Sequence, residues 1–152
     1  MREQEIKELV DKTLEIMKFD GQAEVVKDEN TYRAQITTTE ASRLIGQYGQ
    51  VLLELEHIIR QILSKKINEP FRFFLDINDY RKGRESIIKN LALEYAQRAK
   101  NESRVMVMQP MNAYERRLVH MSLAEDKEVE TFSEGEGEER KVLIKPKKEF
   151  NL

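Results

Sequence analysis

The segment Arg43-Leu44-Ile45-Gly46-Gln47-Tyr48-Gly49-Gln50-Val51-Leu52 decides how the first half of the chain folds. A short helical piece at residues 40–45 runs into its two glycines. A longer stretch at residues 50–66 follows, with apolar side chains at three- and four-residue spacing, which is typical of a helix. Glycine adopts backbone conformations that other residues avoid, so two glycines three positions apart favour a tight corner. The sequence therefore predicts two helices joined by the loop Gly46–Gly49.

The regions on both sides of this loop complete a mixed unit of helices and strands. Residues 1–19 predict an amphipathic helix, because apolar side chains recur every three or four positions, at Ile6, Leu9, Val10, Leu14 and Met17. Strands are predicted at residues 23–27, 31–37 and 71–77, the second of which alternates apolar and polar side chains. The expected order is helix, strand, strand, helix, helix, strand.

A second unit is expected from residue 79 onward. The polar stretch 79–84 is interpreted as a junction that leads into a helix at about residues 85–100 and a short strand at 105–108. Asn112, with Glu115 three residues later, predicts a capped helix that ends near Leu123. Residues 129–133 and 140–145 predict a hairpin across the acidic loop 134–139. The fold class is therefore α+β, with domains at 1–78 and 79–152.

The composition is that of a folded protein without membrane segments. The chain has 152 residues, of which 39% are hydrophobic and 36% are charged. Its longest apolar run is the four residues Val105–Met108, so no membrane span or signal-peptide core is predicted. There is no cysteine, and the two histidines are too few for a zinc site of ordinary ligand type. We expect a soluble cytoplasmic protein without a metal or other cofactor.

Catalysis finds no support in the sequence. There is no P-loop or GxSxG pattern, no paired carboxylates and no evident nucleophile and base, so no catalytic residue is predicted. His57 has no histidine at ligand spacing and is interpreted as a surface residue. The six methionines are interpreted as core filler rather than as an adaptable partner surface.

Charge is distributed unevenly along the chain. The formal net charge is −2, which argues against a generally basic nucleic-acid binder. Residues 81–121, however, carry a net charge of +5, residues 122–139 carry −7 and residues 140–149 carry +4. An anionic partner is therefore compatible with the sequence if it meets the first or the last of these stretches.

The Gly46–Gly49 loop has the composition of a phosphate-backbone contact. Such a loop points the free N–H groups at the start of the following helix outward, and glycine lets a sugar–phosphate backbone approach closely. This is how the GXXG loop of a KH module clamps about four nucleotides. A bare pair of glycines more often marks only a corner between helices, and the order of the surrounding elements favours the binding interpretation here.

Arg116 and His120 form a second candidate site on the capped helix. Four residues place them about 40° apart around the helix axis, so both side chains leave the same face. A guanidinium beside an imidazole suits a phosphate group. The alternative is a solvated helix face or a buried histidine bonded to backbone. Thr131, Ser133 and Arg140 on the predicted hairpin would add hydroxyl and guanidinium donors.

Two motifs resemble the bacterial Jag (SpoIIIJ-associated) family. Residues 43–52 resemble its KH signature, and residues 109–120, followed by Thr131-Phe132-Ser133-Glu134-Gly135 and Arg140, resemble its second domain, named R-3-H for an Arg and a His separated by three residues. The resemblance implies a type II KH domain (α-β-β-α-α-β) at 1–78 and a small α+β R-3-H domain at 79–152. The RNA-binding residues that it implies are Arg43, Gly46, Gln47, Tyr48, Gly49, Gln50, Arg116, Arg117, His120, Thr131, Ser133 and Arg140.

Two departures from the family pattern affect this interpretation. The family usually places a basic residue inside the loop, where this chain has Gln47 and Tyr48, so one phosphate contact is lost and Tyr48 would have to stack on a base instead. Jag proteins also commonly begin with a further small domain, whereas this chain starts at the predicted KH helix. We therefore expect a form that lacks the N-terminal Jag module.

The resemblance implies a non-enzymatic protein that binds single-stranded RNA, regulates gene expression after transcription and is linked to cell elongation or division. Single-stranded DNA is the alternative ligand. The expected protein partners are a small, separate KH-domain protein or a second copy of the chain, without direct membrane insertion. The rival hypothesis is a protein-interaction scaffold, which the net acidity and the uncharged loop favour.

Overall fold

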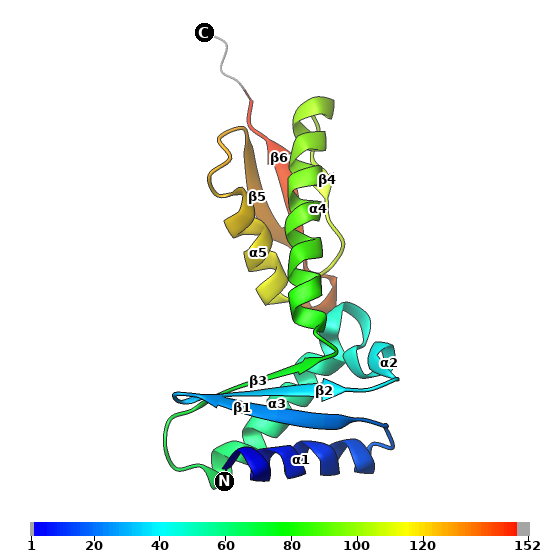
Figure 1. Ribbon diagram of the computed structural model, residues 1–152. Helices are drawn as coiled ribbons and strands as arrows, with labels where there is room; N and C mark the ends of the chain where they lie inside the picture. The colour runs from blue at the N-terminus through cyan, green and yellow to red at the C-terminus, as the bar shows by residue number, and fades with distance from the viewer. Residues whose placement is uncertain (1, 149–152) are drawn as a thin grey trace. The chain divides into compact units, whose positions relative to one another are not determined.

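The computed structural model describes residues 2–148, and its chain divides into two compact units, residues 1–81 and residues 82–152. Each unit contains helices and a three-stranded sheet (Figure 1). The mixed α+β class predicted from the sequence is confirmed.

The first unit is a sheet with two helices on one face. Strands β1 (Gln22–Asp28) and β2 (Thr31–Thr37) are antiparallel, and β3 (Arg72–Ile77) is parallel to β2, so β2 is central. Helices α1 (Arg2–Ile16) and α3 (Gln50–Lys66) pack on the face formed by every second strand residue (Figure 1). With α2 (Ala41–Ile45), the observed order is the predicted one.

A buried carboxylate seals the outer edge of β3. Glu56 on α3 is 6% exposed, and its Oε2 accepts from the backbone N–H of Leu75 at 2.9 Å and from Nη2 of Arg81 at 2.6 Å. Its Oε1 accepts from Nη2 of Arg60 at 2.6 Å. The same two arginines donate to the carbonyls of Phe73 and Leu75, at 3.1 and 2.9 Å. These side chains thus form hydrogen bonds with backbone N–H and C=O groups that an edge strand would otherwise expose.

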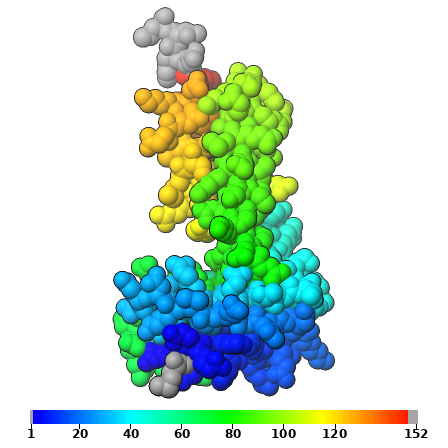
Figure 2. All heavy atoms as spheres, in the orientation of Figure 1, coloured from blue at the N-terminus to red at the C-terminus, as the bar shows by residue number. Residues whose placement is uncertain are grey.

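The second unit packs two helices against an antiparallel sheet. Its strands lie in the order β4 (Met106–Val107), β6 (Lys141–Pro146), β5 (Val129–Glu134). Helix α4 (Tyr80–Glu102) buries the small side chains of Ala92, Ala96 and Ala99, and α5 (Ala113–Leu123) packs into the same core. On the face drawn in Figure 2, side chains of α4 (green) and of α5 and β5 (yellow to orange) lie next to each other.

Two details differ from the sequence-based expectation. Residues 80–84 are helical rather than a junction, because Asn78 and Asp79, at φ 49° and 56°, make the turn, and Asp76 then accepts the N–H of Arg81 at 3.1 Å. Among the methionines, Met106, Met108 and Met111 fill the core as predicted. Met121 does not, since it is 63% exposed.

The Glu56 cluster predicts a large difference between two glutamates of α3. Replacing Glu56 with Gln removes the charge that pairs two arginines and lowers the free energy of unfolding of the first unit by about 3 kcal/mol. Replacing the exposed Glu54, which accepts from Gln50 at 2.9 Å, changes it by less than about 0.5 kcal/mol. Native-state hydrogen exchange of the β2 and β3 amides measures both. Equal protection in the two variants would contradict the role given to Glu56.

Candidate functional site

The Gly46–Gly49 loop joins α2 to α3 as predicted, through a single 3₁₀ turn, η1 (Gln47–Gly49). Three of its residues have positive φ: Gly46 at 74°, Tyr48 at 55° and Gly49 at 75°. A Cβ at Gly46 would lie 2.4 Å from Cγ2 of Val51, so packing as well as backbone conformation requires glycine there. The glycine pair is thus explained locally, before any ligand is considered.

The loop exposes different residues from those expected. Gly49 is buried, Gly46, Tyr48 and Gln50 are half-buried, and only Gln47 is fully exposed. The Nε2 group of Gln50 donates to Oε1 of Glu54 at 2.9 Å. Gln47 and the backbone near Gly46 are therefore the more accessible parts of the loop, whereas Gly49, which we expected to admit a phosphate backbone, is buried.

Arg43 provides the positive charge nearest to this loop along the chain. Its side chain is exposed, its Nη1 lies 3.5 Å from Oε1 of Glu40, and its guanidinium carbon lies 5.4 Å from the centre of the Phe19 ring. The charge is therefore partly compensated. The loop itself carries no positive side chain, so its electrostatic attraction for an anion is weak.

Helix α5 places Arg116 and His120 on one face, toward β5. Its N-cap is Asn112, whose side chain accepts from the N–H of Glu115 at 2.9 Å, as predicted. The His120 ring lies between two hydroxyls, with Nδ1 2.6 Å from Oγ1 of Thr131 and Nε2 2.9 Å from Oγ of Ser133. Thr131 and Ser133 are two apart on a strand, so they face the same side. The structure brings together these predicted residues of helix and hairpin.

Arg116 and Arg140 add two positive charges to this cluster. Backbone carbonyls hold both guanidinium groups, since Nη1 of Arg116 donates to the oxygen of Met111 at 2.6 Å and Nη1 of Arg140 donates to that of Gly135 at 2.7 Å. Burial, and then the charge of Arg140, lower the pKa of Arg116. Within residues 2–148, neither arginine forms an ion pair with a carboxylate.

His120 is held in its neutral form. Burial of the ring, and then the positive charge of Arg116, lower the pKa of His120 below its ordinary value of 6.5. The ring therefore enters the site with one N–H donor and one acceptor nitrogen at neutral pH, and the two hydroxyls complement them. An anion bound beside it would raise the pKa again and add a second donor.

The remaining predicted residue, Arg117, lies outside this cluster. It is exposed on α5 and lines a groove that also contains Tyr114, Leu118 and Met121. An adjacent interaction was not predicted from the sequence: Glu115 is buried, and its Oε1 accepts from Nε of Arg84 at 2.8 Å. The two residues are 31 positions apart, and no short-range pattern connects them.

Comparison with known proteins identifies a known domain in the second unit. Residues 86–146 match the R-3-H domain model. The chain is 33% identical over 133 residues to a protein of Clostridium symbiosum named "RNA-binding protein KhpB", covering 88% of this chain and 60% of that protein. Proteins of the same name from Bacillus subtilis (30% identical; 84% of this chain, 64% of the relative) and Streptococcus pneumoniae (29%; 83% and 39%) also match.

The chain contains an R-3-H domain and has homologues of the Jag family over most of its length. It spans less than two thirds of the length of these relatives. Arg116 and His120, the pair that gives the R-3-H domain its name, lie inside the matched region, as do Thr131, Ser133 and Arg140. The Gly46–Gly49 loop lies before the residues that match the R-3-H domain.

Among residues 2–148, no group of three His, Cys, Asp or Glu side chains is placed to hold a metal ion. Over the same residues, no helix combines the length and the apolar character that crossing a bilayer requires.

The environment of His120 predicts a specific pH dependence of stability. Because its pKa is lower in the folded than in the unfolded chain, protonation favours unfolding, so stability is full above about pH 6.5 and is lost as pH falls below it. A nuclear magnetic resonance titration should place the His120 midpoint below 6.5, and urea unfolding from pH 7.5 downward measures the loss.

The two histidines of the chain give a matched pair of variants for this test. The His120→Gln variant should lose part of the pH dependence of unfolding, because its amide does not titrate in this range. The His57→Gln variant should keep it, because His57 is exposed on α3. A midpoint for His120 above 6.5, or identical pH profiles for the wild type and His120→Gln, would contradict this assignment.

Proposed function

We propose that this protein is a non-enzymatic, cytoplasmic binder of single-stranded RNA, with its main phosphate site on the R-3-H domain at residues 79–152. A KH domain at residues 1–78 supplies a second, weaker contact. The printed names of the relatives, "RNA-binding protein KhpB", support the choice of ligand. Its role in this proposal is post-transcriptional regulation linked to cell elongation or division, in keeping with its likeness to the family.

One observation carries the proposal: burial and the nearby positive charge of Arg140 lower the pKa of Arg116, and neither arginine has a carboxylate partner within residues 2–148. Two positive charges in such an arrangement repel each other. A phosphate placed between them would replace this repulsion with two charge-assisted interactions, and a guanidinium matches phosphate oxygens in geometry. The half-buried position of Arg116 reduces screening by salt.

Each neighbouring group has a defined role in this proposal. His120, Thr131 and Ser133 form one hydrogen-bonded chain beside the arginines, and the hydroxyl that accepts the ring N–H would donate its own proton to a remaining phosphate oxygen. Their hydroxyls would also bind a ribose 2′-OH, which favours RNA over single-stranded DNA. Arg117, exposed on the next face of α5, would meet a neighbouring phosphate.

In the KH domain, Gln47 and the backbone at Gly46 would contact the sugar–phosphate chain, and Tyr48 would stack on a base. Arg43 and Gln50 flank the loop, but both already contact carboxylates of the same domain, Glu40 and Glu54. Their contribution to RNA affinity is correspondingly small. The KH domain is proposed as the weaker RNA-binding site because the positive charge beside its loop is compensated by a nearby carboxylate, whereas those of the R-3-H phosphate site have no carboxylate partner within residues 2–148.

A protein-interaction scaffold is the second candidate, and the loop without a positive side chain favours it. Its partner would be a small KH-domain protein or a second copy of this chain. Competition separates the two functions, because a partner held by a scaffold stays bound in excess RNA, whereas RNA displaces a partner from a shared nucleic-acid surface.

The phosphate site predicts the effect of neutralising its arginines. The Arg116→Gln and Arg140→Gln variants should each bind a single-stranded RNA about 10-fold more weakly, because a charge-assisted hydrogen bond is lost. Arg98→Gln, on α4, should bind like the wild type, because Arg98 is exposed and pairs with Glu102 at 3.4 Å. Fluorescence anisotropy at one fixed low salt concentration measures all three. Equal affinities would refute the site.

The KH loop predicts a gain of affinity. Replacing the exposed Gln47 with Lys adds the missing positive charge, so RNA should bind more tightly, and the salt slope, d log K/d log[salt], should become more negative by about 0.7. Replacing it with Glu should weaken binding. Titrations at several salt concentrations measure the slope. If neither substitution changes the affinity, RNA does not approach this loop.

A further inference from the structure

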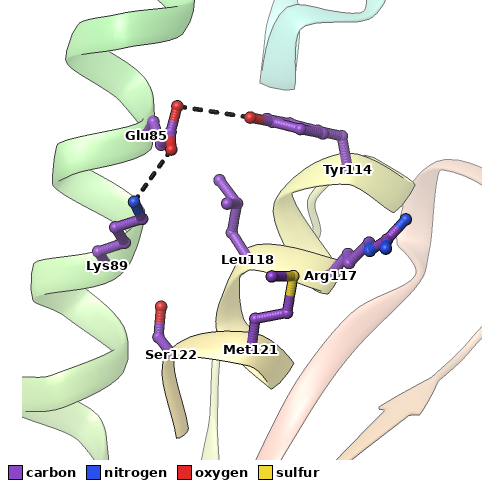
Figure 3. Close-up of a pocket in the computed structure, with 7 residues that line it drawn as sticks. All are labelled: Glu85, Lys89, Tyr114, Arg117, Leu118, Met121 and Ser122. Atoms are coloured by element: carbon purple, nitrogen blue, oxygen red, sulfur yellow. Dashed lines mark hydrogen bonds and ion pairs between the residues drawn. The ribbon is translucent and has the colours of Figure 1, made fainter. Parts of the chain in front are cut away.

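A groove of about 500 Å³ lies between α4 and α5 (Figure 3). Glu85 and Lys89 line it from α4, and Tyr114, Leu118 and Met121 line it from α5. As Figure 3 shows, the Tyr114 hydroxyl points across the groove toward Glu85, and Leu118 projects between the helices. Its volume is in the range of small-ligand sites. Neither the comparisons nor the proposed phosphate site explains it.

The lining of this groove is unusual for the surface of a small domain. Tyr114 is 51% exposed and Met121 is 63% exposed, although both lie on a helix that buries Leu118, Val119 and Leu123. The aromatic ring of Tyr114 and the flexible thioether of Met121 are therefore accessible to solvent beside the buried, apolar Leu118. Aromatic faces of this kind stack on unpaired nucleobases, and methionine adapts its shape to a planar ligand.

The groove adjoins the phosphate site around the same helix. At about 100° per residue, Arg116 and His120 occupy one sector of α5, Arg117 the next, and Met121 and Tyr114 the one after it. Arg117 therefore stands between the two sites and, within residues 2–148, has no carboxylate partner. If the phosphate of a nucleotide binds at Arg116, its base can extend past Arg117 and enter the groove.

The polar rim of the groove has a defined pattern of donors and acceptors. Glu85 lies 3.0 Å from Nζ of Lys89, and the Tyr114 hydroxyl donates to its Oε2 at 3.4 Å, the outer limit of a hydrogen bond (Figure 3). A carboxylate accepts from the exocyclic amino group of adenine, cytosine or guanine, while the adjacent ammonium donates to a ring nitrogen or carbonyl. Uracil has no exocyclic amino group. The single N–H on its pairing edge lies between two carbonyl oxygens, and the carboxylate of Glu85 would repel both oxygens.

We propose that the α4–α5 groove is a nucleobase pocket that holds the base next to the bound phosphate and prefers amino-bearing bases to uracil. Tyr114 stacks on the base, Leu118 and Met121 form the floor, and Glu85 with Lys89 reads its edge. This assignment rests on the proposed function, because the phosphate site anchors the strand that supplies the base.

The first test needs no substitution. In protein labelled with ¹³C on the methionine methyl groups, titration with a hexamer of adenosine should shift the exposed Met121 methyl through the ring current of the bound base. The chemical shifts of the buried Met106 and Met108 methyl groups should not change. A hexamer of uridine should produce a smaller shift at the same concentration.

The second test uses variants of the full chain and fluorescence anisotropy. Tyr114→Leu should weaken adenosine-hexamer binding about 5- to 20-fold through loss of stacking. Phe132→Leu, the matched control, removes an aromatic ring that is 45% exposed on β5 and should bind like the wild type. Glu85→Gln should abolish the preference for adenosine over uridine, because an amide both donates and accepts.

The outcomes separate this pocket from the phosphate site. If Arg116→Gln weakens binding while Tyr114→Leu does not and Met121 stays unshifted, the pocket is refuted and the proposed function stands. If the wild type binds neither hexamer, both proposals fail. A wild type that binds the two hexamers equally refutes the preference for amino-bearing bases. A Met121 shift caused by a protein partner, with none from either hexamer, would make the groove a protein-docking site and would also overturn the proposal.

Discussion

In the second unit of this protein, two guanidinium groups of like charge lie within electrostatic range of each other. Arg116 and Arg140 are held near each other by single backbone carbonyls, without a neutralising carboxylate in residues 2–148. Asn112 caps the start of α5, which carries Arg116, and Arg140 directly precedes β6 of the hairpin. Placing positive charges close together lowers the stability of the free protein. Binding of an anion between them restores that stability. His120 belongs to the same balance, since its lowered pKa keeps a third positive charge out of the site at neutral pH.

The sequence predicted most of the fold because its local patterns agree with its tertiary structure. Period-two alternation located β2, apolar spacing located α3, and Asn112 located the start of α5. The proximity of Thr131 and Ser133 to His120 also followed from local rules, because residues two apart on a strand share a face and a hairpin next to a helix presents that face to it. These predictions needed only short-range information.

The remaining features depend on residues that are distant in sequence. The pairing of Glu56 with Arg81 and that of Arg84 with Glu115 span 25 and 31 positions, so each side chain alone resembles an ordinary surface charge. The burial of Gly49 depends on how α2, α3 and the loop pack, which two glycine letters do not specify. Met121 was misjudged for the opposite reason: apolar residues are usually buried, and its exposure marks a surface whose purpose lies outside the core.

The sealed edge of β3 has a consequence for self-association. Fibrillar growth requires a sheet that can template a new strand on both sides. Glu56, Arg60 and Arg81 occupy the backbone groups of Phe73 and Leu75, so incoming chains find no continuous ladder along that side. Within the first unit, strand exchange would then be confined to β1, where two copies would cap each other and stop. The cluster thus closes one of the two sheet edges of the first unit to an added strand.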